Sequence, residues 1–315
     1  MTTLRQLRYL DALAVAGHFG RAAEAVGVSQ PALSMQIRDL ELALGGPLVE
    51  RGHAGVTLTE LGADVVRRGS AILAAVSDLE DLAAARSGVL TGTLRIGIIP
   101  TLAPYLLPPL IALAAERYPH LRLTVRETVT RTLVAEVTSG NLDAIVASVP
   151  LGFDELAEKS AFEDRFILAV PAGSAHATRS PALAELISTD ELLLLEDGHC
   201  LRDQALAVCA SIDPRRLRSY GATSLATVLH LVAAGQGITF VPEIAADTAL
   251  RSDPRVTLVR FADPQPRRTV GVAWRRSSPR TADFEALATL VADAASAERR
   301  RQRPPGKVAR RRASR

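Results

Sequence analysis

The fold of the N-terminal part of the chain is decided by the stretch Ala22-Ala-Glu-Ala-Val-Gly27-Val-Ser29-Gln-Pro31-Ala-Leu-Ser-Met-Gln-Ile-Arg-Asp-Leu-Glu41. Helix-forming residues run up to Gly27, and glycine suits the left-handed conformation of a tight turn between two helices. Ser29 is placed to cap a second helix, with Pro31 in its first turn, where a missing N–H costs nothing. The stretch therefore predicts two short helices joined at Gly27.

The second of these helices is predicted to have two different faces. Apolar residues recur at helical spacing and predict a buried stripe of Leu33, Ile37, Leu40 and Leu44. The opposite face carries Gln30, Pro31, Ser34, Met35 and Arg38. Such a face can enter the major groove of DNA, where Gln30 could read adenine or bridge a phosphate. An ordinary three-helix core fits the same pattern, so both interpretations stand at this point.

Helical periodicity also predicts a helix on each side of this stretch. Before it, leucines at positions 4, 7, 10 and 13 predict a first helix. The second helix, which leads into Gly27, is expected over Arg21–Val26. After it, Thr59 caps a long helix to about Ser87, with an apolar stripe formed by Leu61, Val65, Ile72, Val76, Leu79 and Leu82. Nothing in residues 1–58 can cover this stripe, which is more typical of a dimer seam or linker helix over residues 59–88.

From Thr93 onward, predicted strands alternate with predicted helices. The strands are expected at 94–99, 121–126, 144–147, 166–170, 192–195, 238–241, 256–259 and 270–274, and helices at 106–118 and 133–139. Residues 92–297 therefore form an α/β region with too many strands for one small sheet.

The only two cysteines of the chain, Cys200 and Cys209, lie in one segment of this region. A helix is predicted to begin near Cys200, which places this thiol at the positive end of a helix dipole. His199 and Arg202 beside it favour the reactive thiolate, whereas nearby acidic residues such as Asp203 oppose it.

The spacing of the two cysteines limits how they can pair. On one intact helix, nine residues correspond to roughly 13 Å of rise, and a disulfide needs Cα atoms within about 7 Å. A bond between them therefore requires the helix to open, as in a redox switch. Two other interpretations stay open: small buried hydrophobic residues, or a metal site with His199, which lacks a fourth ligand.

Composition narrows the class of protein. Two cysteines in 315 residues fit a reducing cytoplasm rather than a disulfide scaffold. The N-terminus is patterned as a helix rather than a signal peptide, and no apolar run reaches the roughly 18 residues that span a membrane. Residues 298–315 carry a net charge of +8, which leaves −5 for the rest of a chain whose total is +3. This basic tail is expected to be disordered, either as a solvated appendage or as a segment attracted to nucleic acid.

The N-terminal motif closely resembles the winged helix-turn-helix of LysR-type transcriptional regulators. The pattern Ala-Ala-(x)3-Gly-Val-Ser-Gln-Pro-Ala-Leu-Ser is shared, and Glu50-Arg51 and 56–59 are similar to the wing and the next helix of that family. Ala54 departs from it, because many relatives carry an arginine there. The resemblance implies that a double-stranded DNA operator contacts Gln30, Pro31, Ser34, Met35, Arg38 and Arg51.

The segment Leu195-Glu-Asp-Gly-His-Cys-Leu-Arg-Asp-Gln-Ala205, with its second cysteine, resembles the peroxide-sensing members of the same family. The resemblance implies a two-lobed regulatory domain shaped like a periplasmic binding protein, with crossovers near Phe166 and Arg267. It also implies a sensing Cys200, a resolving Cys209, and a hydrogen peroxide pocket formed by Thr101, Thr130, His199, Arg202 and Asp203. The resemblance also implies a homodimer or homotetramer and a contact with RNA polymerase. It implies no cofactor.

Two alternatives to this prediction are kept. In the first, the fold is the same and a small organic effector binds in the cleft between the lobes. In the second, the protein is a thiol peroxidase, although such an enzyme has no need of a helix-turn-helix or of an uncovered linker helix.

Overall fold

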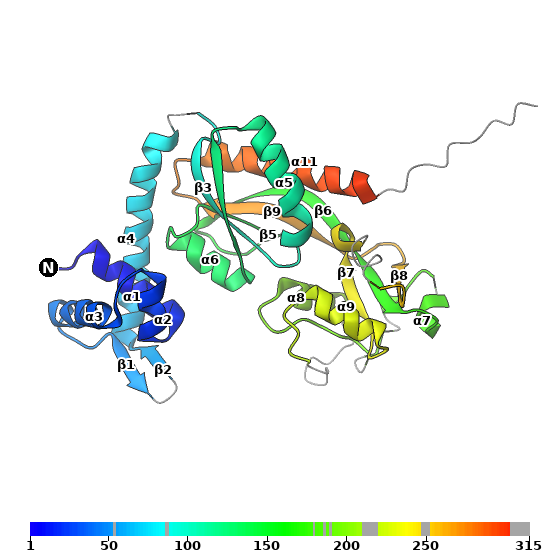
Figure 1. Ribbon diagram of the computed structural model, residues 1–315, viewed down its shortest axis with the longest axis horizontal. Helices are drawn as coiled ribbons and strands as arrows, with labels where there is room; N and C mark the ends of the chain where they lie inside the picture. Colours follow the sequence, from blue (N-terminus) through cyan, green and yellow to red (C-terminus); the bar gives the residue numbers. More distant parts are fainter. Residues whose placement is uncertain are drawn as a thin grey trace, which may run out of the picture.

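A long helix joins a small N-terminal domain to a larger two-lobed α/β region in the computed structural model of the protein (Figure 1). The structure describes residues 1–52, 55–85, 88–178, 180–184, 187–188, 191–209, 220–246 and 253–302. No helix within these ranges is long and apolar enough to cross a lipid bilayer.

The N-terminal domain consists of three helices and a two-stranded wing. Its elements are α1 (Leu4–Ala16), α2 (Phe19–Ala25), α3 (Gln30–Leu44), β1 (Val49–Gly52) and β2 (Gly55–Leu58). Gly27 has φ +68° in the turn between α2 and α3, and the Ser29 side chain accepts a hydrogen bond from the Ala32 N–H, as predicted. The helix α2 begins two residues earlier than expected, because His18 caps it through a hydrogen bond from the Gly20 N–H to Nδ1.

The buried stripe of α3 is mostly as predicted. Leu33, Ile37 and Leu40 are buried in a core shared with α1 and α2, whereas Leu44 is 39% exposed at the end of the helix. The helix α4 (Glu60–Ala85) follows, with Thr59 accepting a hydrogen bond from the Gly62 N–H. Four large apolar side chains of α4 stay exposed in the single chain: Leu61, Ile72, Leu79 and Leu82.

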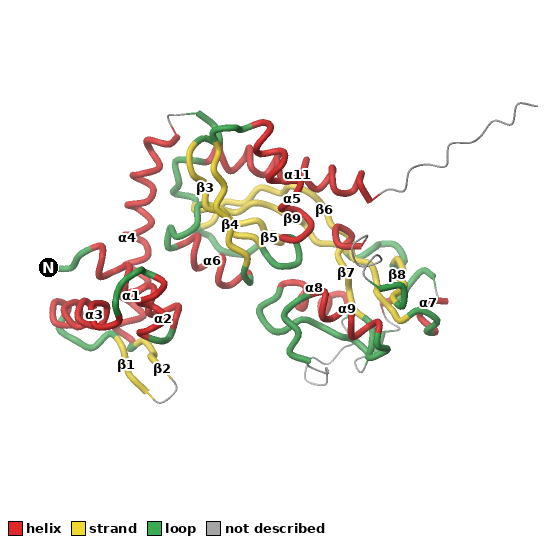
Figure 2. Tube along the Cα trace, viewed as in Figure 1, coloured by secondary structure: helices red, strands yellow, loops and turns green. Residues whose placement is uncertain are grey.

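The first lobe of the α/β region is built on a mixed sheet. Its strands are β3 (Gly92–Ile98), β4 (Leu121–Glu127), β5 (Ala144–Val149), β9 (Arg267–Arg275) and the first part of β6 (Leu156–Pro171). Their order is β4-β3-β5-β9-β6, with β3 parallel to both β4 and β5, and β9 antiparallel to β5 and β6. Figure 2 shows α5 (Ala103–Arg117), α6 (Thr130–Thr138) and α11 (Thr281–Gln302) around this sheet.

The second lobe continues from the same long strand. Residues 156–165 of β6 pair with β9, and residues 166–171 pair with β7 (Thr239–Pro242) and β8 (Val256–Arg260). Around these strands lie α7 (Ala175–Thr178), α8 (Cys200–Val208), α9 (Leu225–Ala233) and the short helix η3 (Glu243–Ala245). The lobes therefore join near Phe166 and Arg267, where the crossovers are predicted.

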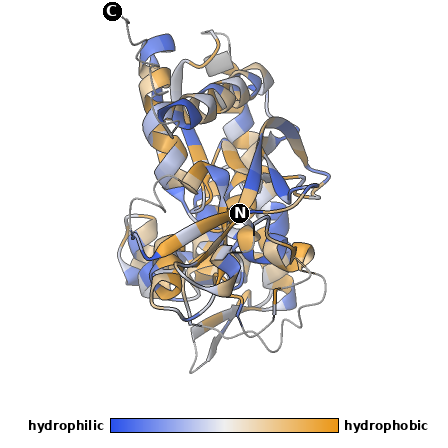
Figure 3. Cartoon of the chain, turned by 90° about the vertical axis from the view of Figure 1, so that its right-hand side faces the viewer, coloured by the Kyte–Doolittle hydropathy of each residue, from blue (hydrophilic) through white to orange (hydrophobic). Residues whose placement is uncertain are grey.

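Each lobe has its own apolar core, and the helices that cover the sheet are amphipathic. The two cores consist of separate sets of buried residues, one around β3, β5 and β9 and one around β6, β7 and α9. Figure 3 shows hydrophobic and hydrophilic residues side by side on the same helices. Such helices bury one face against the sheet and leave the other in water.

Two predictions are wrong in detail. Residues 192–195 do not form a strand: pairing is limited to one bridge between Leu192 and Ile238, after which the Leu193 carbonyl accepts a hydrogen bond from the Thr239 side chain and the backbone ladder does not continue. The basic tail is not disordered from Glu298, because α11 continues to Gln302. Arg299 holds this end by donating to the Glu163 carbonyl and lying over the Phe162 ring. Residues 303–315 lie outside the described part.

Candidate functional site

Cys200 lies at the interface between the two lobes. It is the first residue of α8, and its neighbours on that helix, Leu201 and Ala205, are buried in the core of the second lobe. The Cys200 side chain is half-buried and packs instead against the core of the first lobe. Its sulfur lies 3.8 Å from the hydroxyl of Ser148, on β5 of that lobe. The thiol is therefore placed where a movement of one lobe against the other must change its surroundings.

Cys209 occupies the opposite end of the same helix. It follows the last residue of α8, is 2% exposed, and belongs to the core of the second lobe. Neither of the two cysteines forms a disulfide in this structure. Because α8 is intact, its rise keeps them roughly 13 Å apart along the axis, well beyond disulfide range. As predicted, the two cysteines cannot form a disulfide while α8 is intact.

A buried ion pair lies at the junction of the lobes, next to one predicted pocket residue. Arg268 and Asp164 are 1% and 0% exposed, and Nη2 of the arginine lies 2.9 Å from a carboxylate oxygen. Arg268 Nη1 also donates to the Thr101 hydroxyl at 2.8 Å. A guanidinium can only donate, so the hydroxyl oxygen of Thr101 accepts and its own proton points elsewhere. Thr101 is thus a buried hydroxyl held in a fixed orientation.

Sequence reasoning missed three residues of this junction. The first two are Arg268 and Asp164, and a signal existed for them: charges of opposite sign lie inside or beside buried strands at the two predicted crossovers. Tyr105 on α5 is the third residue, and it packs against the cores of both lobes. Burial raises the pKa of Tyr105, and Arg268 partly offsets the increase.

The other predicted pocket residues lie on α8 or directly before it. Arg202 bonds the Asp197 carboxylate at 2.7 Å and the Leu195 carbonyl at 3.3 Å, so its charge holds the preceding loop. His199 is 7% exposed, and burial lowers its pKa, which favours the neutral imidazole at neutral pH. Asp203 is exposed in the first turn of the helix. Within the described part of the chain, none of the three makes a polar contact with the Cys200 sulfur.

Thr130 does not make the capping hydrogen bond that its position also allows. It is the first residue of α6, and its hydroxyl oxygen is buried with no hydrogen-bond partner in the described structure. The preceding residue, Val129, faces Gly198, the residue two before Cys200 in the chain: a Cβ on that glycine would lie 3.9 Å from the valine. The start of α6 therefore faces the loop that leads to Cys200, and an unpartnered buried hydroxyl is a place where a small polar molecule can bind.

The predicted DNA-reading face lies on the outside of α3. Gln30, Pro31, Met35 and Arg38 are exposed, and Ser34 is half-buried. The side chain of Arg51 and the whole of Ala54 lie outside the described residues. The structure thus brings five of the six predicted DNA contacts onto one helix.

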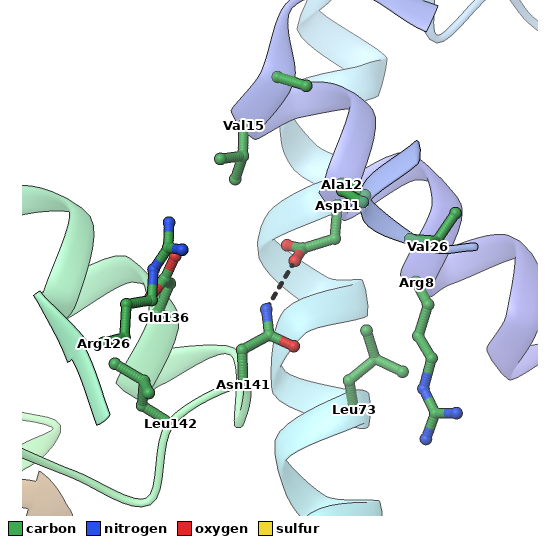
Figure 4. Close-up of a pocket in the computed structure, with 12 residues that line it drawn as sticks. Arg8, Asp11, Ala12, Val15, Val26, Leu73, Arg126, Glu136, Asn141 and Leu142 are labelled. Atoms are coloured by element: carbon green, nitrogen blue, oxygen red, sulfur yellow. Dashed lines mark hydrogen bonds and ion pairs between the residues drawn. The ribbon is translucent and has the colours of Figure 1, made fainter. Parts of the chain in front are cut away.

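A polar contact joins the N-terminal domain to the first lobe (Figure 4). The Asn141 amide donates to the Asp11 carboxylate of α1 at 3.3 Å, and the Ser70 hydroxyl of α4 donates to the same carboxylate at 3.0 Å. Burial raises the pKa of Asp11, and these two hydrogen bonds partly offset the increase. The contact lies in a groove of about 400 Å³ that also includes Arg126 and Glu136.

The loop that carries Asn141 also packs closely against the linker helix. Gly140 has φ +79°, and a Cβ there would lie 3.1 Å from the Cα of Ala74 on α4, so only a glycine fits comfortably. Farther along α4, Asp78 pairs with Arg275 of β9 at 2.6 Å. The first lobe is therefore fixed to the linker helix by backbone contact and by charge.

Comparison with known proteins connects these observations. The family described as "Bacterial regulatory helix-turn-helix protein, lysR family" matches residues 4–63, and the family described as "LysR substrate binding domain" matches residues 87–296. The chain is 39% identical to a probable hydrogen peroxide-inducible genes activator of Streptomyces viridosporus, over 93% of this chain and 94% of that protein. It is 37% identical to the DNA-binding transcriptional dual regulator OxyR of Escherichia coli, over 91% and 94%.

Solved structures agree with the sequence relatives. A full-length OxyR of Pseudomonas aeruginosa with a cysteine-to-aspartate substitution is similar at a TM-score of 0.70 and 35% identity, covering 92% of this chain and 95% of that one. A cysteine-to-serine OxyR mutant of Corynebacterium glutamicum with hydrogen peroxide bound has a TM-score of 0.64 and 33% identity, covering 95% and 94%.

Proposed function

The chain belongs to the LysR family of bacterial transcription regulators, and on that premise we propose that it responds to hydrogen peroxide through a thiol–disulfide switch between Cys200 and Cys209. One observation carries the proposal. A half-buried thiol lies at the lobe interface, and the only other thiol of the chain is buried at the far end of the same short helix. Oxidation can join them only by opening α8, which turns a chemical signal into a change of fold.

The chemistry takes place in two balanced steps. In the first, the Cys200 thiolate attacks one peroxide oxygen, so an S–O bond forms and the O–O bond breaks. The sulfur is oxidised by two electrons, and the hydroxide that leaves takes up a proton to become water. In the second step, the Cys209 thiolate attacks the sulfur of the sulfenic acid, the S–S bond forms, and the departing hydroxide is protonated to water.

Two threonines suit peroxide as the ligand. Peroxide is small and neutral, and it both donates and accepts hydrogen bonds. The Thr101 hydroxyl is oriented by Arg268, and the Thr130 hydroxyl is buried without a partner in the described structure. A relative whose structure contains bound hydrogen peroxide shares the fold of this chain. These observations support a peroxide pocket at the lobe interface that includes both threonines.

The output of the switch is operator binding. The helix-turn-helix domain binds DNA, and the exposed apolar stripe of α4 supports a homodimer through the linker helices, from which a homotetramer can assemble. When α8 opens, Cys200 leaves the surface of the first lobe to reach Cys209, so the lobes must repack. Repacking in a tetramer changes the spacing of the DNA-binding domains, which is how oxidation would alter contacts with the operator and with RNA polymerase.

A footprint of the operator with reduced and with peroxide-oxidised protein tests this function. The two footprints are expected to differ in length or phase, with about one disulfide formed per protomer. Identical footprints, together with unreacted thiols after peroxide, would instead favour a small organic effector in the cleft between the lobes. The second alternative, a thiol peroxidase, is set aside because LysR-family proteins are transcription regulators and not enzymes.

The exposed face of α3 gives a prediction for DNA binding. Gln30→Ala or Ser34→Ala is expected to weaken operator binding by about 1–3 kcal/mol per lost base contact, while thiol oxidation is unchanged. Gln36→Ala is the matched control, because six residues rotate the side chain by about 240° around the same helix. Fluorescence anisotropy with operator DNA measures specific binding, and the same measurement with unrelated DNA measures non-specific binding. Wild-type affinity in the Gln30 and Ser34 variants would show that another surface reads the operator.

A further inference from the structure

Ser148 is a polar residue on an otherwise apolar strand. Ala144, Ile145, Val146 and Ala147 of β5 are buried in the core of the first lobe, and Ser148 follows at the end that faces the second lobe. Its hydroxyl lies 3.8 Å from the sulfur of Cys200, within hydrogen-bond range for sulfur. This contact is formed across the lobe interface, since Cys200 begins a helix whose buried side belongs to the other lobe.

We propose that Ser148 is a positioning residue for the reactive sulfur: its hydroxyl donates a hydrogen bond to the Cys200 thiolate and holds it at the lobe interface. This inference rests on the proposed peroxide response. A thiolate can only accept, so the serine must donate once the thiol has lost its proton. Ser148 neither gives nor takes a proton during the attack on peroxide. It stabilises the anionic sulfur and limits the directions in which it can move.

The residues of α8 leave this role open. Arg202 is engaged by Asp197 and by the Leu195 carbonyl, and the lowered pKa of His199 favours its neutral form. The groups expected from sequence to favour the thiolate are therefore occupied or uncharged. The start of α8 and the Ser148 hydroxyl are what the described structure places at the sulfur.

The contact exists only while Cys200 is reduced and docked. To reach Cys209, whose side chain is buried in the second lobe, Cys200 must leave the surface of the first lobe. The hydrogen bond to Ser148 is therefore broken before the disulfide forms. Removing the hydroxyl should slow the first oxidation step and leave the second step as fast or faster. If Ser148 contributed only to packing of the strand, its removal would not slow the first oxidation step while leaving the second step unchanged.

The test compares Ser148→Ala and Ser148→Thr with the parent in the full-length protein. Two rates are measured at one pH: alkylation of Cys200 by iodoacetamide, and sulfenic acid formation after a peroxide pulse in a Cys209→Ser background with a trapping reagent. Ser148→Ala is expected to slow both by about three- to tenfold, the range of one modest hydrogen bond. Ser148→Thr keeps the hydroxyl and is expected to restore most of each rate. Disulfide formation from the sulfenic acid, followed with Cys209 intact, is expected not to slow.

Ser160→Ala is the control, because this serine is exposed on β6 of the same sheet. It should leave every rate unchanged. Alkylation of Ser148→Ala at the parent rate would overturn the proposal, and so would a threonine variant as slow as the alanine variant. The alkylation series needs no peroxide response. If the parent gives no sulfenic acid, the proposed function fails, while the role of Ser148 at the sulfur is still decided.

Discussion

Replacing Cys200 with serine is expected to abolish the peroxide response altogether. No sulfenic acid should be trapped in this variant, and its operator footprint should stay in the reduced form after oxidant. The reason is accessibility: Cys200 lies half-buried at the lobe interface, whereas Cys209 is 2% exposed in an apolar core. Mass spectrometry after a brief peroxide pulse, with a sulfenic-acid trap present, measures the modification at each cysteine.

The complementary variant, Cys209→Ser, separates the two steps. Here Cys200 should still form a trappable sulfenic acid but no intramolecular disulfide, and it should be over-oxidised at higher peroxide. Equal reactivity of the two thiols, or a complete footprint shift in Cys200→Ser, would contradict the switch. The protein would then be better described as an effector-binding regulator of the same family.

The second large effect is expected at the buried pair Arg268–Asp164. Arg268→Met leaves the Asp164 carboxylate buried without its charge partner, which typically costs about 3–5 kcal/mol of folding free energy. The same change removes the hydrogen bond that orients Thr101. Urea denaturation measures the stability, and the sulfenic-acid assay in whatever fraction stays folded measures the effect on the pocket.

The double variant Arg268→Met/Asp164→Asn tests whether the loss comes from the unpaired charge. The asparagine oxygen can still accept the hydrogen bond from the Ile244 N–H, so the double variant is expected to recover part of the stability lost in the single one. Arg67→Ala is the control, because Arg67 and Asp64 form an exposed pair on α4, and no measurable change is expected there. Equal losses in the single and double variants would mean that packing, not charge, stabilises the junction.

Local signals predicted the helices well and the lobe interface poorly. Gly27 predicts the turn before α3 and Ser29 predicts its N-cap, because a positive φ and a capping hydrogen bond depend only on neighbouring residues. The run Leu192–Leu195 has the composition of a strand, but pairing depends on a distant partner, and the structure forms only one bridge there, between Leu192 and Ile238. The prediction of disorder at the basic end of α11 is wrong for a similar reason, because the ring that contacts Arg299 belongs to Phe162, which is distant in the chain.

The candidate site shows the same division. Both cysteines could be identified from spacing and helix position, since those are properties of one segment. Ser148 and Asp164 lie on β5 and β6, whereas Arg268 lies on β9, far along the chain, and the order of the sheet brings these strands together at the lobe junction. The direction of the Arg202 side chain could not be predicted from the sequence either: its guanidinium pairs with Asp197 instead of with the thiol.

The strand β5 has the contact with Cys200 at one end and the loop that contacts the DNA-binding domain at the other. Ser148 is its second-last residue, and Asn141, three residues before its start, bonds Asp11 of α1. If the two ends are energetically coupled, thermodynamic reciprocity applies: the factor by which oxidation changes operator affinity is also the factor by which operator DNA changes the thiol–disulfide equilibrium. A regulator bound to its operator would then have a different reduction potential from the same protein free in solution, so the promoter itself would take part in setting how much oxidant is needed.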